Sequence, residues 1–177
     1  MARISREKGI HRLVDAFCNI ASDPDYADVR LEVAGYLGPQ NVEFWSRLQQ
    51  QLADSDLAGR YRYHGAIDRA DKVQFLHDVT LLCVPTEFVE PKGLFVLESV
   101  AAGTPYVLPH SGAFPEMHRR LQHGTLYDAN SPDALAAALK SALAREHSEP
   151  RAAEPSPSFH DRQALLSEIS VDTMSAR

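Results

Sequence analysis

Two carboxylates, Glu90 and Glu98, flank a glycine within residues 85–98, whose sequence is PTEFVEPKGLFVLE. Gly93 precedes a helical pattern, and a glycine there lets the backbone turn sharply and approach a ligand closely. The free N–H groups of a first helical turn can bind phosphate oxygens, helped by the helix dipole. This segment therefore has the chemistry of a phosphate-binding turn, a device that many folds use.

Glu98 has a second candidate role because its neighbours are apolar or small. It lies one turn after Leu94 and shortly before Ala101 and Ala102, so the pattern places its carboxylate in an apolar stripe. A buried carboxylate needs hydrogen-bond donors, which ribose hydroxyls would supply. The alternative is that a glutamate early in a helix simply interacts favourably with the helix dipole. From Glu98 alone, this alternative is favoured.

Alternating helices and strands are predicted to position this segment. Apolar residues at helical spacing predict helices over residues 9–22, around 45–52, after 68, over 94–102, over 114–119 and from 131 to 143. Strands are predicted over residues 29–34, 61–65, 79–84, 105–109 and 125–127. The run VTLLCV at 79–84 is continuous and apolar, which is typical of a strand buried on both faces.

This alternation indicates an α/β protein with a Rossmann-like, doubly wound parallel sheet and helices on both faces. In such folds ligands bind beyond the C-terminal ends of the strands. Residues 85–98 follow the most apolar predicted strand. The phosphate-binding turn is therefore expected at the edge of the sheet where ligands bind.

The composition indicates one soluble globular domain and argues against a nucleic-acid partner. The chain has 177 residues, 44% of them hydrophobic, and its net charge of −6 is opposite to that of a nucleic-acid binder. No apolar run reaches the ~18 residues of a membrane span, and residues 1–12 lack the apolar stretch of a signal peptide. Cys18 and Cys83 lie far apart in the sequence and are expected to be small core residues with free thiols, as in proteins of a reducing compartment. We therefore expect a cytoplasmic protein with no membrane span.

Other kinds of site receive little support from the sequence. None of the eight histidines pairs with a cysteine or carboxylate at ligand spacing, so no metal site is expected. Residues 35–39 are glycine-rich but lack the nicotinamide-binding pattern G-x-G-x-x-G, and no serine lies in a G-x-S-x-G elbow. His110 follows a predicted strand, where local hydrogen bonds are favoured over ligand contact. Trp45 is expected in the core.

Residues 90–98, EPKGLFVLE, resemble the E-x₇-E motif of family 4 (group 1) glycosyltransferases, and Gly93, Leu94 and Leu97 match the family's usual residues. Four further segments resemble family motifs in the family's order: RISREKG at 3–9, LEVAG at 31–35, AAGTP at 101–105 and SGAFPE at 111–116. Together the matches extend over residues 3–143, which single motifs would not do by chance. The sequence thus resembles the C-terminal, donor-binding domain of an enzyme with the two-domain GT-B fold.

The resemblance implies that Arg3 and Lys8 bind the diphosphate of a nucleoside-diphosphate sugar. A forked guanidinium and a point ammonium suit spread phosphate charge, and they would stabilise the leaving diphosphate in place of a metal. Without the resemblance, these two residues would be interpreted as a solvated terminal charge cluster. The family retains the anomeric configuration and usually needs no divalent metal, so no cofactor is expected.

The resemblance also assigns roles to both carboxylates of the motif. Glu98 would bind the ribose hydroxyls of the nucleotide, and Glu90 would face the transferred sugar. Backbone N–H groups would complete the phosphate site, from Gly93, Leu94 and Phe95. The acceptor, a sugar or a lipid-linked glycan, would bind to an N-terminal domain that this sequence lacks.

Three departures from the family pattern bear on these roles. Pro91 and Lys92 replace the small and aromatic residues that the family usually has before Gly93, so the identity of the sugar stays open. Lys92 is either an additional cation near phosphate or a solvated surface residue. Gly112 stands alone where the family often has two glycines.

Three functions remain under consideration. The first is the donor-binding half of a retaining glycosyltransferase that transfers a hexosyl group to an acceptor hydroxyl, inactive by itself. The second is a nucleotide-binding module without catalysis of its own. The third is a nucleotide-sugar epimerase of the same architecture. The pair of Arg3 and Lys8, with the form of the E-x₇-E motif, favours the first over the third.

The sequence also predicts where the domain begins and ends. We expect a nucleotide-sugar-binding domain over residues 1–145 and a tail over 146–177, with no regular structure at 146–158 and a short helix near 160–169. Only two residues precede Arg3, where the family has an apolar first strand, as in a truncated chain. A gap near the centre of the sheet is therefore predicted. Unpaired strand edges beside it would favour association and low stability.

Overall fold

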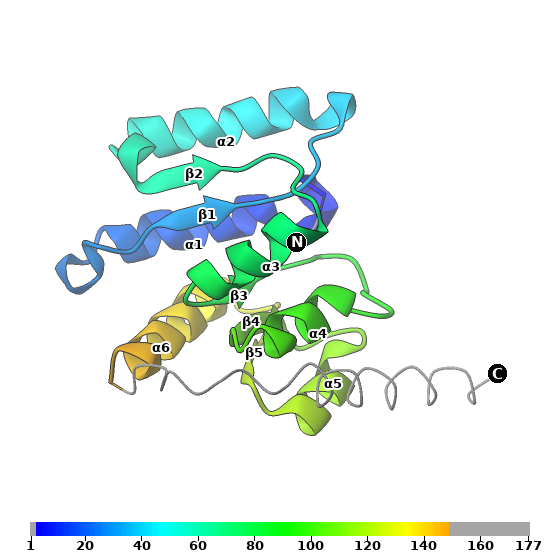
Figure 1. The fold of residues 1–177 in the computed structure, drawn as a ribbon. Helices are drawn as coiled ribbons and strands as arrows, with labels where there is room; N and C mark the ends of the chain where they lie inside the picture. Colours follow the sequence, from blue (N-terminus) through cyan, green and yellow to red (C-terminus); the bar gives the residue numbers. More distant parts are fainter. Residues whose placement is uncertain (1–2, 149–177) are drawn as a thin grey trace.

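The computed structural model describes residues 3–148, in which five short strands alternate with six α-helices (Figure 1). The strands are β1 (Leu31–Val33), β2 (Tyr61–Tyr63), β3 (Leu82–Cys83), β4 (Tyr106–Pro109) and β5 (Gly124–Tyr127). The helices are α1 (Ile10–Ala21), α2 (Val42–Asp54), α3 (Arg69–Asp78), α4 (Leu94–Ala101), α5 (Phe114–Leu121) and α6 (Ala134–Ser148). A short 3-10 turn, η1 (Arg6–Lys8), precedes α1. Every helix and strand predicted between residues 9 and 143 is present.

All strands are parallel, but they form two separate sheets. In the first, β1 pairs with β2, with Leu31 opposite Tyr61. In the second, β4 lies between β3 and β5, and Tyr106 is opposite both Leu82 and Gly124. Helix α1 packs against α2 and α6, whereas α3 packs against α4, so helices cover both faces (Figure 1). The predicted Rossmann-like α/β architecture is thus confirmed.

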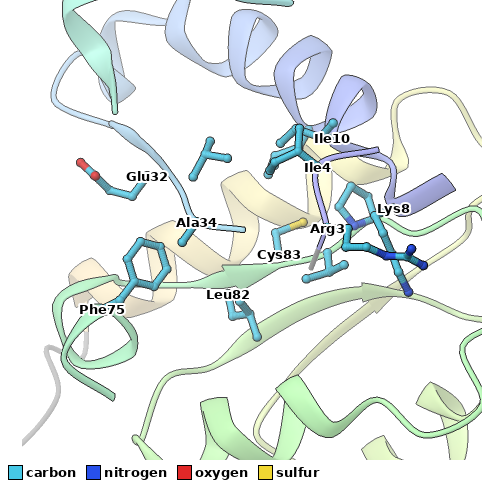
Figure 2. A pocket seen from close by; sticks show the side chains of 13 residues that line it. Arg3, Ile4, Lys8, Ile10, Glu32, Ala34, Phe75, Leu82 and Cys83 are labelled. Atoms are coloured by element: carbon cyan, nitrogen blue, oxygen red, sulfur yellow. The ribbon is translucent and has the colours of Figure 1, made fainter. Parts of the chain in front are cut away.

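The gap expected in the sheet lies between β1 and β3. Within residues 3–148 no strand joins the sheet of β1 and β2 to the sheet of β3, β4 and β5. A cavity of about 70 Å³ occupies this place (Figure 2), and its lining is mainly apolar: Ile4, Ile10, Leu13, Val33, Ala34, Leu82 and Val84. Ile4 is buried, and its N–H donates to the Tyr36 carbonyl at 2.9 Å. Residues just before η1 therefore fill part of the gap.

Helix α1 contributes to two of the hydrophobic clusters that form the core. Val14 and Phe17 pack with residues of β1 and α2. Ala16 and Ile20 pack with residues of β4, β5 and α6. A third cluster joins β3 and β4 to the residues of α4 and α5 that face them. The apolar face of the strongly amphipathic helix α1 is thus broad enough to pack against both sheets.

Several boundaries differ from the sequence prediction: β1 has three residues instead of six, and β2 has three instead of five. Strand β3 has two residues instead of the six of the predicted run at 79–84, because α3 continues to Asp78 and Thr80 is exposed. Helix α6 continues through Ser148, so residues 146–148 are helical, contrary to the expectation of an irregular tail from 146. The rest of that tail, including the helix predicted near 160–169, lies outside the described residues.

Candidate functional site

The first carboxylate of the E-x₇-E segment is paired with a lysine from the start of the chain. The Nζ of Lys8 donates to Oε2 of Glu90 at 2.8 Å, and only 18% and 14% of the two side chains are exposed. The same Nζ lies 5.5 Å from the ring centre of Phe88. The predicted diphosphate-binding cation and the predicted sugar-facing carboxylate therefore lie together.

The Glu90 carboxylate also lies at the N-terminus of α4. Its Oε1 accepts longer hydrogen bonds from the N–H groups of Lys92 (3.5 Å) and Gly93 (3.3 Å). Gly93 is the N-cap of α4 and has a φ of +58°, which glycine adopts without strain. The carboxylate thus occupies the place where the sequence predicts a phosphate group.

These contacts shift the pKa of Glu90. Partial burial disfavours the charged carboxylate, but the hydrogen bonds from Lys8 and from the N–H of Gly93 outweigh it. Together they hold the pKa of Glu90 below its ordinary value of 4.5. At neutral pH the side chain is therefore an anion held by a cation and a helix terminus.

The loop that carries Glu90 is attached to η1 through one carbonyl group. The carbonyl of Glu7 accepts from the N–H of Glu87 (2.9 Å), from the N–H of Phe88 (3.3 Å) and from the hydroxyl of Thr86 (3.1 Å). Thr86 is buried, and its oxygen in turn accepts from the N–H of Phe88 at 3.1 Å. These bonds hold the turn that bears Lys8 against the loop that bears Glu90.

Two glycines permit the close approach of backbone segments around this loop. Gly9 has a φ of +74°, and a Cβ there would lie 1.9 Å from the Pro85 carbonyl oxygen. Gly112 has a φ of +58°, and a Cβ there would lie 2.6 Å from the Glu90 carbonyl oxygen. That oxygen accepts from the N–H of Ala113 at 2.9 Å. The glycines of the EKG and SGAFPE segments are thus required by packing against the loop.

The second carboxylate of the segment has a partner that the sequence analysis did not identify. Oε1 of Glu98 accepts from the Nζ of Lys72, on α3, at 2.7 Å. The Glu98 side chain is 40% exposed, so the predicted burial among apolar residues is only partial. No sequence pattern around Lys72 predicts this ion pair, because a pair between distant elements depends on how α3 packs against α4.

The remaining predicted residues lie in several parts of the fold. Arg3 and Lys8 both line the cavity between the sheets (Figure 2). Lys92 is exposed, and the backbone N–H of His110 donates to the Tyr127 carbonyl next to the pairing of β4 and β5; the hydrogen bonds expected of the His110 side chain stay a prediction. Trp45 is buried in the core, as predicted. The ligand contacts assigned to the predicted residues stay predictions.

Three large apolar side chains, on the loop and at the start of α4, are exposed to solvent. Phe88, Val89 and Leu94 are exposed to solvent by 54%, 67% and 62%. Among residues 3–148, no helix has both the length and the apolar character needed to span a bilayer. Within the same residues no cluster of three or more histidine, cysteine or acidic side chains is placed to hold a metal ion.

The sequence matches a known protein family and proteins within it. The profile described as "Glycosyl transferases group 1" matches residues 1–156. A phosphatidyl-myo-inositol mannosyltransferase of Mycobacterium tuberculosis is 30% identical over 136 residues, which are 77% of this chain and 33% of that protein. A glycogen synthase of the same organism is 29% identical over 143 residues, or 81% of this chain and 33% of that protein. The chain thus spans about a third of the length of these curated relatives.

Solved structures resemble the fold. The C-terminal domain of a group 1 glycosyltransferase, LpcC from Francisella tularensis, superimposes with a TM-score of 0.72 at 22% identity, covering 81% of this chain and 73% of that one. HepE from Anabaena, solved in complex with UDP and glucose, gives a TM-score of 0.68 at 25% identity, covering 80% of this chain and 36% of that one. With the profile matching most of its length, this chain belongs to the group 1 glycosyltransferase family.

Proposed function

We propose that this domain binds the nucleoside-diphosphate sugar donor of a retaining glycosyltransferase that transfers a hexosyl group to an acceptor hydroxyl. The observation that carries the proposal is the Lys8–Glu90 pair at the N-terminus of α4. A cation and free helical N–H groups form a site for a diphosphate. Glu98, which lies on α4, supplies hydrogen-bond acceptor oxygens for the ribose hydroxyls.

The donor diphosphate would take the place of the Glu90 carboxylate. Phosphate oxygens would then contact Lys8, the N–H groups at the start of α4, and Arg3. The carboxylate released from Lys8 would accept hydrogen bonds from hydroxyls of the sugar. As the bond between sugar and phosphate breaks, Lys8 and Arg3 would stabilise the charge that develops on the leaving diphosphate, without a metal.

The acceptor would bind outside residues 3–148. The chain spans about a third of its curated relatives, and Phe88, Val89 and Leu94 form an exposed apolar rim beside Glu90. A second domain that packs on this rim would close the cleft and place the acceptor hydroxyl. Because positioning can supply ~7–11 kcal/mol of a barrier, the 177-residue chain alone would not transfer sugar at a useful rate.

Calorimetry of the 177-residue chain tests the proposal. UDP or GDP should bind, and Glu98→Ala should weaken nucleotide binding more than binding of inorganic diphosphate, because Glu98 contacts ribose. Equal losses for both ligands would remove the ribose assignment. An absence of nucleotide binding by a folded chain would refute the proposed donor site.

A second candidate is a nucleotide-binding module that does not catalyse transfer. Such a module would bind the donor at the same residues and would leave the acceptor to another protein. Transfer measured with and without a separately expressed acceptor domain would distinguish the two. The relatives named above are a transferase and a synthase, so nothing in them favours an epimerase. A cytoplasmic location is part of the same proposal, since nucleotide sugars would be available there.

A further inference from the structure

One ion pair beside the proposed site has no role in the function as described so far. Lys72 lies on α3, whose first turn is capped by the side chain of Asp68. The Nζ of Lys72 contacts Oε1 of Glu98 on α4 at 2.7 Å. The two residues are 26 positions apart and come from helices that pack together. The pair therefore depends on the tertiary structure and not on the sequence spacing within a helix.

The geometry leaves half of the carboxylate available. Lys72 contacts Oε1 of Glu98, and no hydrogen bond to Oε2 is found among the described residues. A glutamate that is 40% exposed and has no partner would sample several rotamers, and fixing it on ligand binding would cost entropy. A lysine on one oxygen restricts that motion before a ligand arrives.

If Lys72 and Glu98 formed only a surface ion pair, the pair would add little to the stability of the fold. Exposed pairs typically contribute little to the free energy of unfolding. The Lys72 side chain is 29% exposed, and the pair joins two helices at a carboxylate to which we assign a ligand. A preorganising effect on binding is thus a better account of its position than a stabilising effect on the fold.

We infer that Lys72 is a positioning residue that holds Glu98 with one oxygen directed to the ribose hydroxyls of the donor nucleotide. The inference rests on the proposed function. It deepens that function, because recognition of the ribose then depends on α3 as well as on α4. Lys72 itself touches neither phosphate nor the reacting atoms.

A comparison of ligands with and without ribose hydroxyls tests this role. We would measure the Kd of UDP and GDP for the 177-residue chain. The nucleotide that binds more tightly would then be compared with its 2′,3′-dideoxy analogue and with inorganic diphosphate. Lys72→Met should weaken binding of the normal nucleotide about fivefold, a typical coupling between groups in contact. It should leave the Kd of the dideoxy analogue and of diphosphate unchanged, and Lys72→Arg should restore part of the loss.

The matched control is Lys140→Met, which removes an ion pair of the same length, 2.7 Å, between α6 and Asp23. This variant should bind all three ligands as the unmodified chain does. Equal weakening of all three ligands by Lys72→Met, or no weakening at all while the unmodified chain binds nucleotide, would overturn the positioning role alone. An unmodified folded chain that binds neither nucleotide would overturn the proposed function, and the positioning role with it.

Discussion

The Glu90 carboxylate lies at the predicted phosphate-binding turn, bonded to Lys8 at 2.8 Å and to the N–H groups of Lys92 and Gly93, directly before α4. An anion from the protein itself thus occupies the proposed phosphate site. Any diphosphate must compete with it for the same cation and the same helix terminus. Glu90 is therefore expected to weaken binding of a bare phosphate ligand, even though the proposed reaction needs its carboxylate.

Replacing this carboxylate by an amide should make inorganic diphosphate bind more tightly. Glu90→Gln removes an anion from a helix N-terminus, an interaction of about 0.5–1 kcal/mol. We expect the Kd of diphosphate to fall about two- to fivefold, measured by calorimetry. Glu43→Gln, at an exposed position in the first turn of α2, is the control and should leave the Kd unchanged. Weaker binding of diphosphate by Glu90→Gln would contradict the competition.

The ion pair should make stability depend on pH in a defined direction. The pKa of folded Glu90 is below its ordinary value of 4.5, so the unfolded chain takes up a proton first as the pH falls. The stabilisation is complete above the unfolded value and is lost as the pH falls through the folded value. Urea unfolding should show the natural chain more stable than Glu90→Gln at pH 7, with the difference shrinking below pH 4.5. The pKa of Asp23 is also lowered, but this residue is present in both proteins, so its contribution cancels in the difference between them. A difference that grows in acid would contradict this reasoning.

Gly9 should be intolerant of any side chain. A Cβ would lie 1.9 Å from the Pro85 carbonyl oxygen, and the φ of +74° is strained for alanine. We expect Gly9→Ala to lower the free energy of unfolding by about 2–4 kcal/mol, measured by urea denaturation. Gly59→Ala is the control, because a Cβ at that position would meet no heavy atom within 4 Å and its φ is not positive. Equal effects of the two substitutions would show that the contact with Pro85 is not tight.

The gap between β1 and β3 should accept another strand. Five apolar residues joined directly before residue 1 can pair with both free edges and cover the apolar lining of the cavity. We expect the melting temperature to rise by about 3 °C or more, which corresponds to ~1 kcal/mol in a domain of this size. A glycine and serine extension of equal length is the control. A melting temperature equal for both extensions would show that the gap is closed to a strand.

The fold was predictable because its elements have strong sequence periodicity. The alternation of helical and strand patterns along residues 9–143 was sufficient to predict a Rossmann-like α/β fold. The length of β3 was not predictable, since Val79 and Thr80 continue the apolar pattern but lie in the turn after α3. Residues of high β propensity do not form a strand where no neighbour pairs with them.

The site was predictable where a local motif carries it. Glycines and carboxylates near α4 follow from the spacing within residues 85–98. The partners of the two carboxylates do not, because Lys8 is 82 positions from Glu90 and Lys72 is 26 positions from Glu98. Sequence spacing gives no information about which cation meets which anion across such separations. The packing of η1 on the loop and of α3 on α4 decides both pairs.

Helix α1 has a consequence for how this molecule opens. No strand connects the two sheets within residues 3–148, but α1 places Val14 and Phe17 in the cluster of the first sheet and Ala16 and Ile20 in a cluster of the second. Partial unfolding of this helix would remove apolar cover from both cores in the same event. The two sheets should therefore lose protection from hydrogen exchange as one cooperative unit. The mechanical link between the halves of the domain is thus a helix and not the sheet.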